Sequence, residues 1–250
     1  MNSELRLAMW SGPRNLSTAL LRSFGNRADC VVADEPFYAH YLAVTGIDHP
    51  GRDEVLASQE HDWRKVAAHL MGEIPEGKTL WYQKHMAHHL LTGMEGDWFG
   101  KLHHAILIRR PERVIASFAR VIAQPGLDDT GFVQLRAVYR RARDLGRPVP
   151  VLDSDDLQTA PQAMLEALCA VLGIAFDPAM LHWPAGPRPS DGVWARHWYR
   201  AVLTSTGFAP PQSEIPELAG KLAELAARCR PLYDELAGDR LRPDRPFREL

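Results

Sequence analysis

The chain of 250 residues contains few cysteines and no regular cysteine spacing. Its three cysteines, Cys30, Cys169 and Cys229, form an odd and widely separated set. Such a set indicates neither a disulfide framework nor a zinc site built on cysteine thiolates. We therefore expect three buried thiols without a chemical role.

Long apolar runs are absent as well. No stretch approaches the roughly 18 apolar residues that a membrane-spanning helix requires. The first residues also lack the basic, apolar and cleavage regions of a signal peptide. The sequence accordingly predicts a cytoplasmic protein with no membrane partner.

The chain has no large excess of charge of either sign. A net charge of -2 argues against a general nucleic-acid-binding protein. Apolar residues make up 46% of the chain and charged residues 24%, proportions typical of globular proteins. This length suits one α/β domain, residues 1–250, with a substantial core. The sequence carries no signal for an oligomeric state.

Short apolar runs alternate with helix-like segments over much of the chain. Strands are expected at residues 5–10, 30–33, 79–83, 105–108 and 149–152. Helices are expected at residues 16–24, 53–71, 111–122, 132–145, 161–172 and 216–236, and an irregular tail at 240–250. The alternation predicts a mainly parallel sheet with helices on both faces, a three-layer α/β/α domain.

The most informative segment joins the first expected strand to the first helix. Residues 11–18, here called the cradle, read Ser-Gly-Pro-Arg-Asn-Leu-Ser-Thr. A strand, a tight turn and a helix with hydroxyls in its first turn form an anion-binding site, because free backbone N–H groups and the positive end of the helix dipole point at the ligand. The cradle lacks the Gly-Lys-Ser/Thr of nucleoside triphosphatases and has Arg14 instead. The alternative is an ordinary strand-to-helix loop with a hydroxyl cap.

A second segment points to the same chemistry. Arg109 ends the fourth expected strand, at the carboxyl edge where open α/β sheets bind ligands. Ser117 follows eight residues later, about two turns into a helix that Pro111 begins. Arg109 and Ser117 could therefore face one ligand.

Together and in this order, the two segments resemble the sulfotransferase family, and the resemblance extends over about residues 5 to 200. It implies a P-loop-like nucleotide-binding fold and the donor 3′-phosphoadenosine 5′-phosphosulfate (PAPS). In that family the cradle holds the 5′-phosphosulfate, and an arginine and a serine eight positions apart hold the 3′-phosphate. The implied donor-binding residues are Gly12, Pro13, Arg14, Asn15, Leu16, Ser17, Thr18, Arg109 and Ser117. Asn15-Leu16 departs from the Ser-Gly of many relatives.

Two later segments are also similar to the family. Residues 153–173 resemble its Tyr-Glu-Asp-Leu segment and the helix that follows. Residues 188–194, Arg-Pro-Ser-Asp-Gly-Val-Trp, resemble the loop that closes over the 3′-phosphate. The resemblance therefore implies Arg188 and Gly192 as further donor-binding residues. Trp194, Trp198 and Tyr199 either cover the purine ring or pack in the core.

The catalytic base has two candidates. Glu35 follows the second strand, where some bacterial sulfotransferases carry a catalytic glutamate, and partial burial would raise its pKa toward that of a useful base. Otherwise Glu35 caps a helix or pairs with an arginine. His85 or His88 is the other candidate, although the family's Lys-Thr-His spacing is displaced by one residue here. Lys84 either contacts a sulfonate or bridging oxygen or lies on the surface.

A zinc site and an aromatic acceptor pocket are the remaining interpretations. His85, His88 and His89 share helical spacing, but they have no acidic or cysteine partner at motif spacing, so a metal is not expected. We expect residues 38–78 and 120–147 to form the walls of the acceptor site. The aromatic side chains in or beside these walls are Tyr38, Tyr41, Trp63 and Trp81.

The sequence thus predicts transfer of a sulfuryl group from PAPS to a hydroxyl or amine of a small molecule or carbohydrate, leaving 3′,5′-ADP. Arg14, Glu35, Lys84 and His85 are the expected catalytic residues, with Arg14 neutralising the departing 5′-phosphate. Arginine suits phosphate because its planar fork binds two oxygens at once. Two alternatives stay open: a P-loop small-molecule kinase, and a non-catalytic nucleotide-binding protein that retains the fold.

Overall fold

A five-stranded parallel sheet forms the centre of the protein in a computed structural model that describes residues 4–122, 124–211 and 213–244. Its strands are β1 (Leu5–Ser11), β2 (Cys30–Asp34), β3 (Leu80–Met86), β4 (His103–Ile108) and β5 (Val151–Asp153). They lie in the order β2-β3-β1-β4-β5, and every neighbouring pair is parallel. The predicted parallel sheet is confirmed.

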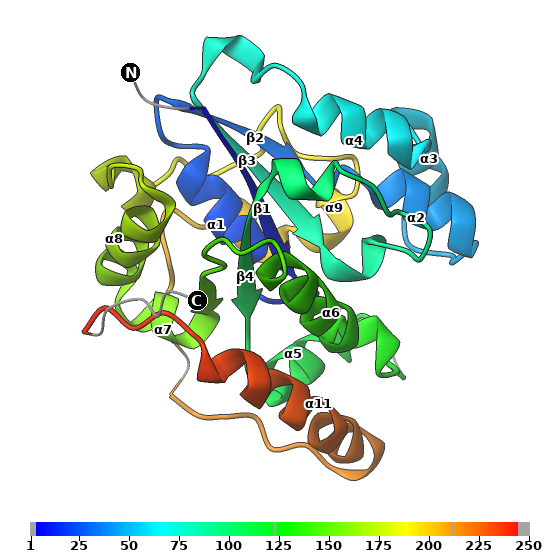
Figure 1. The fold of residues 1–250 in the computed structure, drawn as a ribbon. Helices are drawn as coiled ribbons and strands as arrows, with labels where there is room; N and C mark the ends of the chain where they lie inside the picture. The colour runs from blue at the N-terminus through cyan, green and yellow to red at the C-terminus, as the bar shows by residue number, and fades with distance from the viewer. Residues whose placement is uncertain (1–3, 123, 212, 245–250) are drawn as a thin grey trace.

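Helices cover both faces of this sheet (Figure 1). One face packs against α1 (Ser17–Phe24), α7 (Ser154–Thr159) and α8 (Pro161–Leu172). The other packs against α4 (Trp63–Met71), α5 (Pro111–Phe118), α6 (Phe132–Arg143) and α11 (Gly220–Gly238). The short helices α2 (Tyr38–Thr45), α3 (Arg52–Ser58), α9 (Ala195–Trp198) and α10 (Arg200–Leu203) complete the fold.

The central strand β1 shows why its sequence is apolar almost throughout. Side chains alternate between the two faces of a strand. Leu7 and Met9 accordingly enter one hydrophobic cluster, and Ala8 and Trp10 enter the other. All four are fully buried, as expected for a parallel strand covered by helices on both sides.

Three of the expected helices differ from the structure. The single helix expected at residues 53–71 is two helices, because the backbone is extended at Gln59 and the Asp62 side chain begins α4 by accepting the Arg64 N–H at 2.9 Å. The helix expected at 111–122 already ends at Phe118. The last helix begins at Gly220 rather than at residue 216. Helices α2 and α7 were not predicted.

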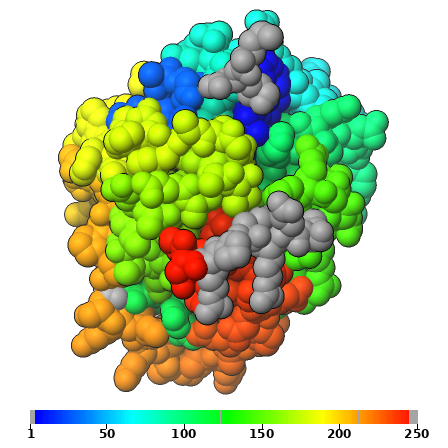
Figure 2. Space-filling view, turned by 60° about the vertical axis from the view of Figure 1, so that its left-hand side comes forward, coloured from blue at the N-terminus to red at the C-terminus, as the bar shows by residue number. Residues whose placement is uncertain are grey.

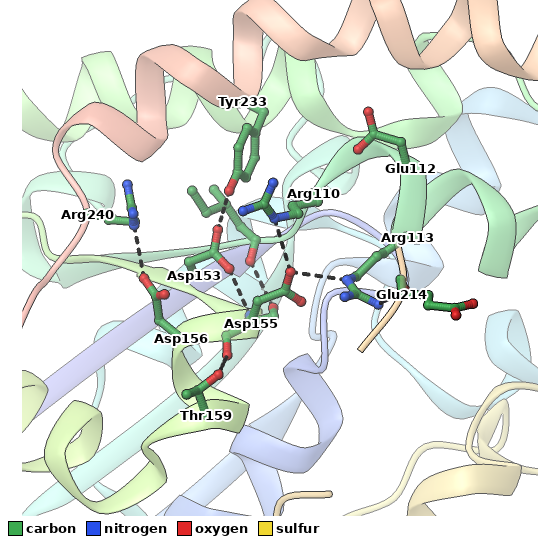
Figure 3. A network of polar contacts seen from close by, with 12 residues as sticks. Arg110, Glu112, Arg113, Asp153, Asp155, Asp156, Thr159, Glu214, Tyr233 and Arg240 are labelled. Atoms are coloured by element: carbon green, nitrogen blue, oxygen red, sulfur yellow. Dashed lines mark hydrogen bonds and ion pairs between the residues drawn. The ribbon is translucent and has the colours of Figure 1, made fainter. Parts of the chain in front are cut away.

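A polar network fixes the C-terminal helix beside the β4–β5 edge (Figure 3). The Asp153 carboxylate at the end of β5 accepts hydrogen bonds from the Tyr233 hydroxyl of α11 at 2.6 Å and from the Asp155 N–H at 2.8 Å. Arg240 pairs with Asp156 at 2.9 Å. The described C-terminal residues therefore lie against the segment around α7 (Figure 2). The end of the expected tail, residues 245–250, lies outside the described residues.

Two further expectations concern the cysteines and membrane-spanning helices. The three cysteines are buried and unpaired, as predicted. Within the described ranges, no helix is both long and apolar enough to cross a membrane.

Candidate active site

A cavity of about 310 Å³ opens at the carboxyl edge of the sheet. The segments that follow β1, β2 and β4 contribute residues 13–19, Glu35 and Arg109, while Lys84 and Met86 come from β3. Residues of α2 and of the segment 198–209 form further walls. Parallel α/β sheets bind their ligands at this edge, so the cavity is the candidate active site.

The cradle has a strained backbone held by polar contacts. Arg14 and Leu16 have φ values of 62° and 65°, a left-handed conformation that side-chain-bearing residues seldom adopt. Asn15 Nδ2 donates to the Leu107 carbonyl at 3.1 Å, and Ser154 Oγ donates to the Asn15 carbonyl at 2.8 Å. No side chain caps α1 at Leu16. The N–H groups of its first turn are thus available to a ligand in the cavity.

Arg109 and Ser117 meet the cradle in this cavity. Arg109 Nη1 donates to the Arg14 carbonyl at 2.9 Å, and Arg14 Nε donates to Ser117 Oγ at 2.9 Å. Burial lowers the pKa of both arginines, but a guanidinium keeps its charge at neutral pH. Arg109 Nε is buried and has no hydrogen-bond partner among the described residues. Two cations and a helix N-terminus thus lie together, an arrangement suited to an anion.

A buried ion-pair network lies at the centre of the cavity. Lys84 Nζ donates to Asp34 Oδ1 at 2.8 Å, to Glu35 Oε1 at 2.6 Å and to the Tyr199 hydroxyl at 2.7 Å. These three bonds use the whole donor capacity of the ammonium. The Tyr199 hydroxyl in turn donates to Asp34 Oδ2 at 2.6 Å and accepts the Trp194 Nε1–H at 3.1 Å. The Lys84 and Asp34 side chains are each 1% exposed, so neither charge is stable there without the other.

The pKa values of Glu35 and Lys84 are both raised in this network, for different reasons. Burial raises the pKa of Glu35 above its ordinary value, with the Asp34 charge adding to the effect and Lys84 opposing it. Burial disfavours the charged Lys84 ammonium, but Asp34 and Glu35 outweigh it and hold the Lys84 pKa well above normal. Lys84 is therefore a permanent cation, and Glu35 is the carboxylate suited to accept a proton.

The histidines divide between the cavity and the core. His88 and His89 line the cavity. His85 does not belong to the described lining; its ring stacks on Trp10 with a 4.4 Å centroid separation in the core. Burial lowers the pKa of His85 and of His88 to about 3, so both rings are neutral at pH 7. The placement of His85 argues against its predicted catalytic role.

Three predicted donor-binding residues also lie outside the described lining: Gly12, Arg188 and Gly192. The Arg188 N–H binds Asp191, which pairs with Arg22 of α1 at 2.7 Å, and this segment borders a separate hollow of about 420 Å³. A Cβ on Gly192 would lie 2.1 Å from the Trp194 indole. Gly192 thus makes room for the buried Trp194 indole.

Sequence reasoning missed two members of the network, Asp34 and Tyr199. Asp34 adjoins Glu35, but no pattern distinguished their roles. Tyr199 was read as part of a purine cover or the core, and nothing in the sequence pairs it with Lys84, 115 positions away. Of the aromatic residues expected at the acceptor site, Tyr38 and Tyr41 line the cavity, whereas Trp63 and Trp81 pack against the helix-covered core. In the described part of the chain, no three His, Cys, Asp or Glu side chains are arranged to hold a metal ion.

Comparison with known proteins gives one family match and two curated relatives. A model of the sulfotransferase domain matches residues 5–238. Two Arabidopsis thaliana proteins, named branched-chain-amino-acid aminotransferase-like proteins 1 and 2, are 40% and 38% identical over 227 residues. That match covers 91% of this chain, but the chain spans only 40% of the length of either relative.

Solved sulfotransferase structures share the fold. The sulfotransferase domain of the curacin biosynthetic pathway has a TM-score of 0.52 at 15% identity, covering 92% of this chain and 99% of its own. The sulfotransferase domain of the Synechococcus PCC 7002 olefin synthase has a TM-score of 0.52 at 19% identity, and the match covers 91% of this chain and 94% of that domain. A sulfotransferase from Alicyclobacillus acidocaldarius has a TM-score of 0.53 at 14% identity, and the match covers 94% of this chain and 95% of that protein. At these identities the likeness concerns the fold, and the predicted P-loop-like architecture is confirmed.

Proposed function

The chain belongs to the sulfotransferase domain family, and from this premise we propose that it transfers a sulfuryl group from PAPS to the hydroxyl group of a small molecule. Family and fold support sulfotransferase activity as such. The identity of the donor and the acceptor is our proposal. One observation carries it: the cradle and the Arg109–Ser117 pair, far apart in sequence, share one cavity.

The residues in the cavity suit a donor with two anionic groups. The N–H groups at the start of α1 would bind the 5′-phosphosulfate. Arg109 and Ser117 would bind the 3′-phosphate, and the unpartnered Arg109 Nε supplies a donor for it. Since Arg14 Nε binds Ser117, the guanidinium of Arg14 would serve the 3′-phosphate as well as the leaving group.

The proposed transfer requires little covalent chemistry from the protein. The acceptor oxygen would form a bond to sulfur while the bond from sulfur to the 5′-phosphate oxygen breaks, and its electron pair leaves with 3′,5′-ADP. Glu35 would take the hydroxyl proton. Lys84 and Arg14 would offset negative charge near the reacting atoms, because catalysis of group transfer depends mainly on positioning and charge.

Two other activities fit the site less well. The aminotransferase-like name belongs to relatives of which this chain spans 40%, so the name does not carry over to this domain. A kinase would need the Gly-Lys-Ser/Thr that the cradle lacks. A non-catalytic nucleotide-binding protein would not need a buried carboxylate at the sheet edge with a raised pKa.

The test combines nucleotide binding with turnover. By calorimetry we expect 3′,5′-ADP to bind more tightly than ATP with Mg²⁺, and a preference for ATP would overturn the proposal. With labelled PAPS and an acceptor panel, Glu35→Gln should lose about 10²- to 10⁴-fold in turnover and keep its affinity for 3′,5′-ADP. The matched control is Glu73→Gln, which changes an exposed carboxylate outside the described cavity lining.

A further inference from the structure

Six residues of the described cavity lining carry rings that contact one another. This ring set consists of Tyr38, Tyr41, His49, His88, His89 and Trp198. Tyr38 and Tyr41 each stack on His89 with centroids 4.7 Å apart. The Tyr38 hydroxyl bonds His49 Nδ1 at 2.9 Å, and the His49 ring lies 6.1 Å from the Trp198 ring. The contacts make one continuous surface of aromatic faces and edges.

The histidines of the ring set carry no charge at neutral pH. Burial lowers the pKa of His88 to about 3 and holds that of His89 well below its ordinary value. Burial also lowers the pKa of His49. The surface thus offers neutral donors and acceptors together with ring faces.

Two carboxylates act on the tyrosines of the ring set. After burial, the Glu35 charge is the next cause that raises the pKa of Tyr38, and the Asp129 charge does the same to Tyr41. Asp129 lines the cavity and has no ion-pair partner among the described residues. Of the cations in the described lining, Arg14 donates Nη1 to the Trp198 carbonyl at 3.4 Å, Arg109 lies at the cradle, and Lys84 is held between Asp34 and Glu35.

Two imidazole nitrogens of the ring set are buried and have no hydrogen-bond partner among the described residues. His89 is 2% exposed, and its Nδ1 has no hydrogen-bond partner in the described structure. His88 Nδ1 is likewise buried and without a partner there. Buried polar atoms in proteins are nearly always hydrogen-bonded, so these two nitrogens have a bonding capacity that polar groups of a bound molecule could use.

On the basis of the proposed function, we propose that the acceptor is a small amino alcohol, with its ammonium group against the Tyr41 ring near Asp129 and its hydroxyl toward Glu35. Ring faces attract a cation, and so does the Asp129 carboxylate, which accepts the Gly126 N–H at 2.7 Å and has no ion-pair partner in the described structure. A carboxylate or phosphate on the acceptor would be repelled. A phenol could stack on the rings, but the negative charge that develops on its oxygen would be disfavoured.

The test compares alcohols that differ only in charge. Choline, ethanolamine and 3-aminopropan-1-ol are paired with their neutral isosteres 3,3-dimethylbutan-1-ol, propan-1-ol and butan-1-ol, and 4-ethylphenol and glycolate are added. Affinities are measured by calorimetry on the protein with and without 3′,5′-ADP, and turnover with PAPS. In at least one pair the cation should be favoured about tenfold, which corresponds to a cation–π contact in a desolvated site. Equal or weaker binding of the cation in all three pairs, or tighter binding of 4-ethylphenol or glycolate, would overturn the inference.

Matched variants locate the effect. Asp129→Asn should reduce the preference for the cation roughly threefold, as for a partly exposed charge, whereas Asp128→Asn in the same turn should leave it unchanged. Tyr41→Leu should reduce it and Tyr41→Phe should retain it, because phenylalanine keeps a ring face. If 3′,5′-ADP binds but no cation is preferred, the acceptor class is wrong and the donor assignment stands. If 3′,5′-ADP does not bind, the proposed function fails, and the cation preference is still read from the nucleotide-free protein.

Discussion

Arg14 Nε donates to Ser117 Oγ at 2.9 Å and so joins two segments that are 103 residues apart. Arg109 strengthens the junction by donating to the Arg14 carbonyl at 2.9 Å. One end of the Arg109 guanidinium therefore supports the cradle backbone, while its Nε has no partner among the described residues. The arrangement would allow one arginine both to shape the proposed 5′ site and to bind the proposed 3′-phosphate.

Arg109→Lys should separate these two roles. Lysine keeps the charge but loses the planar fork, so we expect the affinity for 3′,5′-ADP to fall about 10- to 100-fold, the cost of a charge-assisted hydrogen bond. The affinity for 5′-AMP, which has no 3′-phosphate, should fall less. Calorimetry with both nucleotides measures the difference, and Arg110→Lys is the neighbouring control. An equal loss for both nucleotides would show that Arg109 acts only by supporting the cradle.

Tyr199→Phe should weaken both the fold and catalysis. The hydroxyl that it removes accepts from Lys84 and Trp194 and donates to Asp34. Leaving these buried groups unpaired should lower the free energy of unfolding by about 1–3 kcal/mol. Turnover should also fall because Lys84 and Glu35 lose part of their support, while the affinity for 3′,5′-ADP stays the same.

The control for this prediction is Tyr233→Phe. Its hydroxyl also donates to a buried carboxylate, that of Asp153, at 2.6 Å, but it lies outside the Lys84 network. Urea unfolding should show a loss of stability in both variants, and steady-state kinetics should show a loss of turnover in Tyr199→Phe alone. Equal turnover in the two variants would contradict a positioning role for Tyr199.

The sequence predicted those parts of the site that are built from local strand–loop–helix segments. The cradle and Arg109 each follow a strand directly, so the carboxyl edge of the sheet brings them together. His85 lies outside the described cavity lining because β3, which was expected to end at residue 83, continues to Met86. Alternation along the strand then directs Lys84 to the cavity and His85 to the core beside Trp10. Tyr199 reaches Lys84 only through tertiary packing, for which the sequence has no periodic signal.

The buried histidines should make stability depend on pH. His104 accepts the Trp10 Nε1–H at 3.0 Å on Nδ1, and its Nε2 contacts the Phe99 carbonyl at 2.8 Å, so the neutral Nε2–H form satisfies both contacts. Burial lowers its pKa to about 3. The unfolded chain binds a proton near pH 6.5 and the folded chain does not. Stability is thus complete above pH 6.5 and is lost as the pH falls toward 3.

Urea unfolding between pH 7.5 and 4.5 measures this effect. His104, like His85 and His88, should contribute up to about 1.4 kcal/mol per pH unit below pH 6.5. In His104→Gln, the free energy of unfolding should change less steeply with pH, by the contribution of one histidine. In the parent protein, ¹⁵N spectra should show the Nε2–H tautomer of His104 at pH 6. A charged His104 at pH 6, or an unchanged slope in the variant, would contradict the assignment.

Gly12→Ala should distort the cradle backbone, although Gly12 itself does not belong to the described cavity lining. A Cβ at this position would lie 2.7 Å from the Thr130 carbonyl oxygen, closer than real Cβ contacts, and the obstacle is backbone that no side-chain rotation can move. The cradle and the turn at residues 128–131 must then separate. We expect the free energy of unfolding to fall by about 1–3 kcal/mol, the usual cost of overpacking, together with weaker binding of 3′,5′-ADP.

The control for Gly12→Ala is Gly238→Ala at the end of α11, where an added Cβ meets nothing within 4 Å. Because alanine favours the helix over glycine, this variant should be as stable as the parent or slightly more so. Urea unfolding and calorimetry with 3′,5′-ADP compare the two variants. If Gly12→Ala matches Gly238→Ala in both measurements, the contact between residue 12 and Thr130 does not constrain the cradle. If Gly12→Ala is destabilised but binds the nucleotide normally, that contact supports the fold and leaves the anion site to Arg109 and the start of α1.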